Sequence, residues 1–406
     1  MVKKISEDLI LAYALKNAVE HNGNAQTGSV LSSLFYEGLD RGEVKKILPE
    51  IKKQVDKVNK LGLEEQKKQF LKLEKKTSQR EGRVGLSELP KAGKGVIMRF
   101  APSPSGPLHI GHAMTACISF LYVQKYGGKF YIRIEDTNPE NIYKPAYKMI
   151  AEESKWLFNN KAIVIIQSER MVLYYKYAEK LLKSGDAYVC TCDSEKFKEF
   201  VSEKKNCPCR ALSAKENLER WKKMLLKTKG YEEGEAVLRF KSNMQDKNPA
   251  FRDFPLARIN EANHALQGNK YRVWPLMNLA VSVDDLELKM THIIRAKEHR
   301  DNAERQKMIF KALGKTKKIP WTAFLGRIHF KDLHLSTTQM RKDIEDGKYT
   351  GWDDKRLPSL ISLRKQGYKP EAFYGFAEQV GLSEVDKVID KKEFFELLDT
   401  FNKKNQ

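Results

Sequence analysis

The fold is decided by residues 95–135, which read GVIMRFAPSPSGPLHIGHAMTACISFLYVQKYGGKFYIRIE. Gly95–Ala101 is a short apolar run of the kind that forms a buried parallel strand, and Phe130–Glu135 is a second one. Between them, Ile110–Tyr126 is predicted to be a helix, which a Gly127-Gly128 pair ends as a C-cap. A strand, a helix and a strand with close connections indicate a βαβ unit, and hence an α/β protein with a doubly wound parallel sheet.

The second half of the same sheet is expected further along the chain. Val273–Val283 is an apolar run that ends in two aspartates, and Thr291–Arg295 is a further strand candidate. The cysteine-bearing region between the two halves is therefore predicted to be an insertion.

The segment before residue 90 is predicted to be helical and basic. Ser6 can cap a first helix, and apolar residues from Val44 to Val58 form the stripe of a second helix, with Pro49 at its start or at a kink. Lysines crowd the opposite face through Lys76. Such a face is either a solvated surface or one that contacts phosphates, and the pattern leaves both open.

Charge and hydropathy narrow the class of protein. The 406 residues include 74 Lys and Arg against 53 Asp and Glu, which gives a formal net charge of +21. A hydrophobic content of 41% excludes a disordered chain, and the excess charge indicates a polyanionic partner, nucleic acid first, with a merely basic surface as the alternative. No apolar run approaches the roughly 20 residues of a membrane span, and Met1–Glu7 lacks a signal-peptide core, so we expect no membrane partner and a cytoplasmic location.

Four of the five cysteines lie close together in the sequence. They are Cys190, Cys192, Cys207 and Cys209, whereas Cys117 stands alone. Four thiolates suit a structural Zn2+ ion, although C-x-C is a less usual spacing than C-x-x-C. Free reduced thiols are the alternative.

The helix expected at Ile110 begins at the motif Pro107–His112 (PLHIGH). A helix N-terminus presents unpaired N–H groups and a partial positive charge, which together bind polyphosphate well. His109 and His112 can donate hydrogen bonds to phosphate oxygens, and Gly111 lets a purine ring approach the backbone. We therefore expect a nucleotide site here; the alternative is a pair of core histidines.

Two longer blocks carry a resemblance to a known family. Met98–His112 resembles the signature of glutamyl-tRNA synthetases, and Gly128–Pro139 is similar to that family's second block. Tyr349–Asp354 and the N-terminal extension resemble the archaeal and eukaryotic branch. The resemblance implies a class I synthetase with a Rossmann-type catalytic domain, an inserted acceptor-binding domain and helical modules at both ends. It implies that glutamate and ATP, with Mg2+, form a glutamyl-adenylate, and that tRNA then accepts the glutamate.

The resemblance also implies six parts of the chain. These are a helical basic extension (1–90), the first half of the catalytic domain (91–185), the inserted acceptor-end domain (186–255), the second half of the catalytic domain (256–330), a mobile signature loop (331–350) and a helical stem-contact module (351–406).

Site residues are carried over position by position. The amino-acid pocket is implied to consist of Arg99, Ala101, Ser103, Glu135, Met277 and Arg295. The ATP site is implied to consist of Pro102, Gly106, His109, Gly111, His112 and Gln339. Catalytic roles fall to His109, His112, Ser336 and Arg341. Glu135 suits the ammonium group of glutamate, and the two arginines suit its two carboxylates.

Three departures from the family pattern are visible. Met277 stands where the family usually has a substrate-contacting tyrosine, and Asp284–Lys289 lacks the usual His and Gly. In the loop His334–Lys342, neither usual lysine position holds a lysine, and Gln339 occupies one of them. We expect Arg341, or else Lys342 or Lys331, to supply the missing positive charge.

The chain ends where full-length relatives continue into β-barrels that read the anticodon. A minimal enzyme, a separate anticodon-binding subunit and a trimmed chain are all compatible with this, as is activity on both tRNA-Glu and tRNA-Gln. Two other functions stay open: a nucleotidyltransferase of the same superfamily, and a catalytically weakened tRNA-binding subunit.

Overall fold

The computed structural model describes residues 5–78, 85–93, 95–333 and 335–404, and it divides into two compact units, residues 1–83 and 84–406. Among the described residues, no helix has the length and apolar character that crossing a membrane requires.

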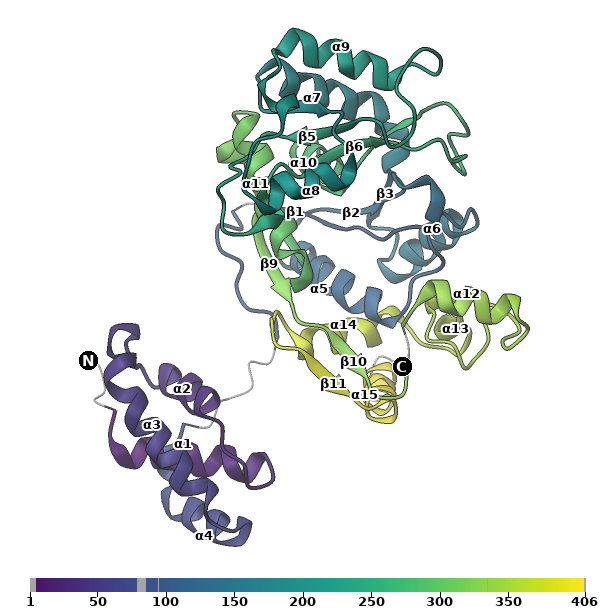
Figure 1. Ribbon diagram of the computed structural model, residues 1–406. Coiled ribbons are helices and arrows are strands. Elements are labelled where there is room, and N and C mark those ends of the chain that lie inside the picture. Colours follow the sequence, from purple (N-terminus) through teal and green to yellow (C-terminus); the bar gives the residue numbers. More distant parts are fainter. Residues whose placement is uncertain (1–4, 79–84, 94, 334, 405–406) are drawn as a thin grey trace. The chain divides into compact units, whose positions relative to one another are not determined.

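The first unit is a set of packed helices (Figure 1). Its helices are α1 (Glu7–Glu20), α2 (Thr27–Tyr36), α3 (Val44–Asn59) and α4 (Leu63–Leu73). Ser6 caps α1 as predicted, because its side chain accepts a hydrogen bond from the Leu9 amide. Helix α3 begins at Val44, so Pro49 lies inside the helix and does not start it. Leu15, Leu34 and other fully buried side chains form a core of the unit's own.

A parallel sheet forms the centre of the second unit. Strands β1 (Val96–Phe100), β2 (Gly128–Ile134) and β3 (Ala162–Ile166) pair in parallel in that order. Helix α5 (Ile110–Tyr126) connects β1 to β2, and α6 (Ala146–Leu157) precedes β3. The βαβ unit predicted from the sequence is confirmed.

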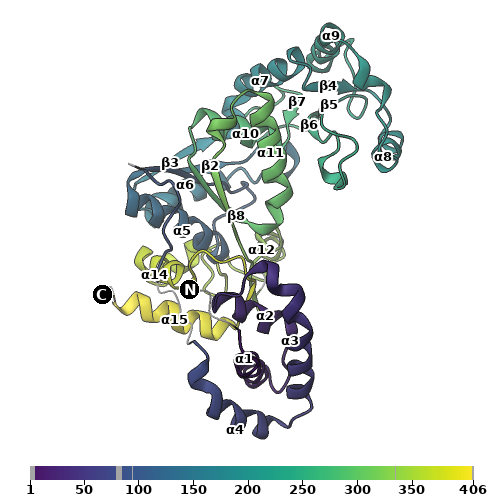
Figure 2. The ribbon, with the colours of Figure 1, turned by 90° about the vertical axis from the view of Figure 1, so that its left-hand side faces the viewer.

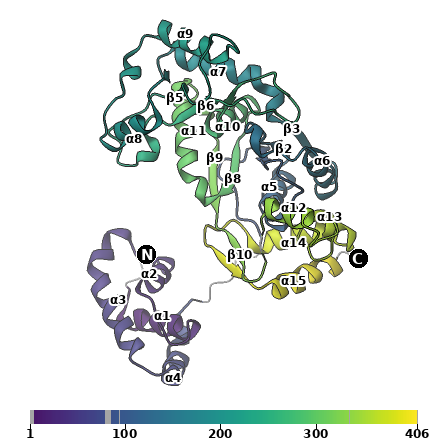
Figure 3. The same cartoon turned by 45° about the vertical axis from the view of Figure 1, so that its right-hand side comes forward.

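The other half of the sheet lies against β1. Strands β8 (His292–Ala296) and β9 (Trp321–Leu325) are parallel, with α11 (Arg300–Ala312) between them in sequence (Figure 3). The Thr291 amide donates to the Ile97 carbonyl oxygen at 3.0 Å, which places β8 beside β1. The strand order β3-β2-β1-β8-β9 is that of a Rossmann-type doubly wound sheet, so the predicted fold class is confirmed.

The apolar run Val273–Val283 was wrongly predicted to be a strand of this sheet. Only β7 (Val273–Pro275) is extended, and it belongs to a separate antiparallel sheet. The rest of the run forms α10 (Met277–Glu287), which lies beside α11 (Figure 2). Residues 278–286 of α10 are all buried, and a helix buried on every side has the same apolar sequence as a buried strand.

The inserted sheet contains β4 (Ala187–Cys190), β5 (Val237–Phe240), β6 (Pro255–Ile259) and β7 in antiparallel order. It extends beyond residue 255, where the sequence places the end of the insertion. The helices of this region are α7 (Met171–Lys183), α8 (Ser194–Ser202) and α9 (Ala214–Leu225). Trp221 and Trp274 are both buried in its core.

The C-terminal segment packs directly on the parallel sheet's helices. It contains α12 (Thr337–Glu345), α13 (Leu360–Lys365), α14 (Pro370–Val380) and α15 (Lys391–Lys404). Helix α14 contacts α5, and the Tyr374 hydroxyl donates to the Leu157 carbonyl oxygen. The segment is not purely helical, because β11 (Lys387–Ile389) pairs with β10 (Ile328–Phe330).

Candidate active site

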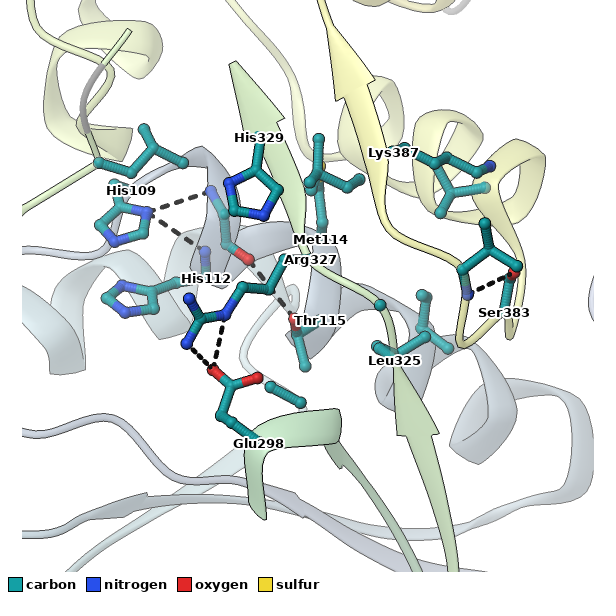
Figure 4. Close-up of a pocket in the computed structure, with 18 residues that line it drawn as sticks. His109, His112, Met114, Thr115, Glu298, Leu325, Arg327, His329, Ser383 and Lys387 are labelled. Carbon is teal, nitrogen blue, oxygen red and sulfur yellow. Dashed lines mark hydrogen bonds and ion pairs between the residues drawn. The ribbon is translucent and has the colours of Figure 1, made fainter. Parts of the chain in front are cut away.

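The start of α5 is capped by a histidine side chain. His109 is the N-cap, and its Nδ1 accepts hydrogen bonds from the Gly111 amide at 3.1 Å and the His112 amide at 3.4 Å (Figure 4). The Ile110 amide donates to the Pro358 carbonyl oxygen. The expectation of unpaired N–H groups at this helix start is therefore wrong, because these amides already have acceptors. Since Nδ1 accepts, the proton of a neutral His109 lies on Nε2.

Both histidines are held in the neutral form. Their rings stack with centroids 3.7 Å apart. Burial lowers the pKa of His112 to about 4. Burial, followed by the neighbouring His112, also lowers the pKa of His109. At neutral pH the pair can therefore donate hydrogen bonds but carries no positive charge.

A cavity of about 420 Å³ opens beside this helix start (Figure 4). The motif residues His109, Gly111 and His112 line it on one side, and Arg327 and Glu298 line it on another. Glu298 Oε1 accepts from Arg327 Nε at 3.1 Å and from Nη2 at 2.9 Å. Most of the other side chains that line it are apolar, and an apolar lining with a few polar groups is typical of a small-molecule site.

A second cavity of about 390 Å³ adjoins the first, since His112, Thr115 and Ala296 line both. All six residues predicted for the amino-acid pocket line it: Arg99, Ala101, Ser103, Glu135, Met277 and Arg295. They come from β1 and the loop after it, from the end of β2, from the start of α10 and from β8. The structure thus gathers residues that lie far apart in the sequence around one hollow.

A buried ion-pair network supports the second cavity. Arg133 donates to Asp285 Oδ1 at 2.6 Å and to Glu135 Oε1 at 3.0 Å. Arg99 also bonds Asp285, through Nε at 3.3 Å. Burial alone would raise the pKa of Asp285, but Arg99 and Arg133 together hold it below its ordinary value.

Arg133 and Asp285 have no role in the site predicted from the sequence. The available signals were the charged Arg133 inside an otherwise apolar strand, and the aspartate pair at the end of an apolar run. A buried charge needs a buried partner, so an acidic partner for Arg133 could have been expected from the sequence, but not which acid it would be.

The predicted loop residues do not reach either cavity. Ser336 caps α12 by accepting from the Gln339 amide, and Gln339 Nε2 donates to Asp343. Arg341 pairs with Glu345 at 3.7 Å and lies over the Tyr143 ring. Leu335 is the residue of the described part of the loop that lines the first cavity, while Lys331 and Lys342 line neither; His334 lies outside the described residues.

Besides Gln339, two residues predicted for the ATP site do not line the first cavity. Pro102 lines the second cavity and not the first. Gly106 packs against the loop, since a Cβ placed on it would lie 2.3 Å from Thr337 Cγ2 and 3.0 Å from the Trp352 ring. Gly106 therefore allows α12 to approach the segment that precedes the histidine motif.

The four predicted metal ligands come together. The Sγ atoms of Cys190 and Cys207 are 3.9 Å apart, and those of Cys192 and Cys209 are 3.8 Å apart. All four lie within 4.8 Å of one another. A tetrahedral Zn2+ ion with Zn–S bonds of about 2.3 Å needs sulfur atoms roughly 3.8 Å apart, so the geometry fits. Arg220 Nη1 donates to Cys209 Sγ at 3.2 Å, which favours its thiolate form.

The order of the parallel strands, the histidine-started α5 and the inserted sheet together define the catalytic fold of a class I aminoacyl-tRNA synthetase. Residues 95–404 match the model of the family described as tRNA synthetases class I (E and Q), catalytic domain. The chain belongs to this family.

Curated relatives cover nearly the whole chain. It is 42% identical over 394 residues to the glutamate–tRNA ligase of Methanobrevibacter smithii, across 96% of this chain and 70% of that protein. It is 43% identical over 381 residues to the glutamate–tRNA ligase of Methanocaldococcus jannaschii (94% and 68%) and 44% identical over 394 residues to that of Pyrococcus abyssi (94% and 68%).

Solved structures agree on the fold. The crystal structure of a glutamate tRNA ligase from Elizabethkingia meningosepticum, in complex with its amino acid, matches with a TM-score of 0.53 and 22% identity over 77% of this chain and 70% of that one. A glutamate–tRNA synthetase from Elizabethkingia anophelis matches with a TM-score of 0.50 and 22% identity, over 75% of this chain and 70% of that one.

Proposed function

We propose that this chain is a glutamate–tRNA ligase that joins glutamate to tRNA through a glutamyl-adenylate. The observation that carries the proposal is the adjacency of the two cavities at His112 and Thr115. One cavity lies at the histidine motif and suits ATP. The other presents two arginines and a glutamate, which suit the two carboxylates and the ammonium group of glutamate.

The chemistry follows from position and charge. The α-carboxylate of glutamate attacks the α-phosphorus of ATP, a new O–P bond forms and pyrophosphate leaves. The terminal ribose hydroxyl of tRNA then attacks the acyl carbonyl carbon, and AMP leaves. His109 and His112, both neutral, donate hydrogen bonds to phosphate oxygens as negative charge builds up. Bound Mg2+ would neutralise phosphate charge in the same cavity.

The loop residues belong to the first step of this proposal, in which pyrophosphate leaves. Ser336, Gln339 and Arg341 act on the pyrophosphate group only if α12 shifts, because none of the three lines either cavity. Arg341, already a cation, is the best replacement for the lysine that the family usually places here.

The remaining parts serve the tRNA. The inserted domain with a structural Zn2+ ion holds the acceptor end, and residues 351–406 contact the stem. A cytoplasmic location completes the proposal.

The test is ATP–pyrophosphate exchange with glutamate, with and without total tRNA. Exchange that tRNA stimulates, followed by label on tRNA, supports the proposal. Label on a small acceptor would indicate a nucleotidyltransferase instead. No exchange together with salt-sensitive tRNA binding would indicate a tRNA-binding subunit.

A further inference from the structure

The two arginines of the second cavity differ in their partners. Arg99 is 5% exposed and bonds the carboxylate of Asp285 through Nε and Nη2, at 3.3 and 3.5 Å. Arg295 is 8% exposed, and its Nη1 donates to Gln306 Oε1 at 2.9 Å. The first guanidinium is therefore paired with a negative charge, whereas the second is held by a neutral amide.

Arg295 lines the cavity but has few partners of its own. Its Nε is buried without a partner among the described residues, and within that part of the chain no carboxylate lies within 4.0 Å of its guanidinium. Burial, followed by the positive charge of Arg99, lowers the pKa of Arg295 to about 10, which still leaves it charged at neutral pH. A buried cation without a counter-ion is costly unless a ligand supplies the charge.

The charges around the cavity have the same imbalance. The described ion-pair network joins three guanidiniums, those of Arg99, Arg133 and Arg170, to three carboxylates, those of Glu135, Asp284 and Asp285, and Arg295 is a fourth guanidinium beside it without an ion pair. Arg170 is paired with Asp284, and Arg133 with Glu135 and Asp285. One positive charge is left in excess. A glutamate zwitterion carries one net negative charge, and glutamine carries none, so only glutamate balances the cluster.

Gln306 fixes the guanidinium without neutralising it. It lies on α11 and is buried, and its Nε2 faces Asn278 Oδ1 on α10 at 3.5 Å. Because the amide nitrogen faces an acceptor, the amide oxygen is directed at Arg295. A glutamate at this position would form an ion pair with Arg295 and occupy it.

We propose that Gln306 is a specificity-determining positioning residue, which orients Arg295 through a neutral hydrogen bond and so keeps its charge free for the side-chain carboxylate of glutamate. The inference rests on the proposed function. It assigns selection against glutamine to a residue outside the ring of side chains that line the cavity.

The test is the KM for glutamate in ATP–pyrophosphate exchange with tRNA present. Gln306→Glu places a competing carboxylate on Arg295, and we expect the KM for glutamate to rise at least about tenfold while the KM for ATP stays within about twofold. The preference for glutamate over glutamine, measured as a ratio of kcat/KM, should fall with it. Lys311→Gln is the matched control, because it removes one positive charge from the exposed face of the same helix.

Gln306→Met covers the case in which the buried glutamate prevents folding. It keeps the side-chain volume and removes the acceptor, so we expect a smaller rise in the KM for glutamate and a wild-type melting temperature. Unchanged glutamate KM values in the folded variants would overturn the inference, and so would equal rises in both KM values. Wild-type protein without glutamate-dependent exchange would instead overturn the proposed function.

Discussion

His109 performs two tasks that a pair of substitutions can separate. Its Nδ1 caps α5 through the Gly111 and His112 amides, and its Nε2 carries the proton beside the first cavity. Asparagine is among the best N-cap residues, and its Oδ1 can take the place of Nδ1. His109→Asn should therefore retain the cap and lose the Nε2 donor, whereas His109→Ala should lose both.

The expected sizes follow from these contacts. Loss of the cap in His109→Ala costs about 1 kcal/mol of unfolding free energy, and His109→Asn should cost close to nothing. Loss of one preorganised donor lowers kcat by about 10²–10³ in both variants. Urea unfolding and the rate of glutamate-dependent pyrophosphate exchange measure the two effects. An asparagine variant within about threefold of the wild-type exchange rate would refute the donor role, and one as unstable as the alanine variant would refute the capping role.

Three further predictions concern the buried ion pairs, the cysteines and the loop. Asp285→Asn should lower the free energy of unfolding by about 3–5 kcal/mol and raise the KM for glutamate. The neighbouring Asp284→Asn should also lower the free energy of unfolding but leave the KM for glutamate unchanged, and steady-state kinetics will measure both KM values. Because the pKa of Asp285 is lowered on folding, its stabilisation is present above its unfolded pKa of about 3.9 and disappears as pH falls through the folded value; acid unfolding of Asp285→Asn should therefore be less steep in pH. Metal analysis of protein purified without added zinc should find one Zn2+ per chain. Both a chelator and Cys209→Ser should lower the melting temperature. A protein without zinc whose four cluster thiols titrate in the native state would exclude the zinc site. Gly106→Ala should lower the free energy of unfolding by about 1–3 kcal/mol, because its Cβ would clash with Thr337. An unchanged unfolding midpoint would exclude the close packing of Gly106 against Thr337.

The local parts of the fold could be predicted because their causes are local. The helix from Ile110 to Tyr126 has the predicted bounds, since the motif before it and the Gly127-Gly128 pair after it set its ends. The cysteine cluster was also predictable, because four of the five cysteines lie close together in the sequence.

The failures concern what only tertiary structure decides. Whether Val273–Val283 forms a strand or a helix depends on what surrounds it, and its buried helical part has no polar face to mark its period. That His109 occupies the amides of its own helix depends on one side-chain rotamer. The sharing of Asp285 by Arg99 and Arg133 depends on where α10 meets two strands, which no spacing in the sequence reveals.

The most direct test of the central claim is the transfer of radiolabelled glutamate to total tRNA by the full chain with ATP and Mg2+. We expect acid-precipitable label that appears only when ATP is present. Mild alkali should release this label, as expected for an ester of the terminal ribose. Excess unlabelled glutamate should suppress the labelling, and excess glutamine should not. Label that appears with glutamine in place of glutamate, or no label from protein that binds ATP and tRNA, would contradict the account.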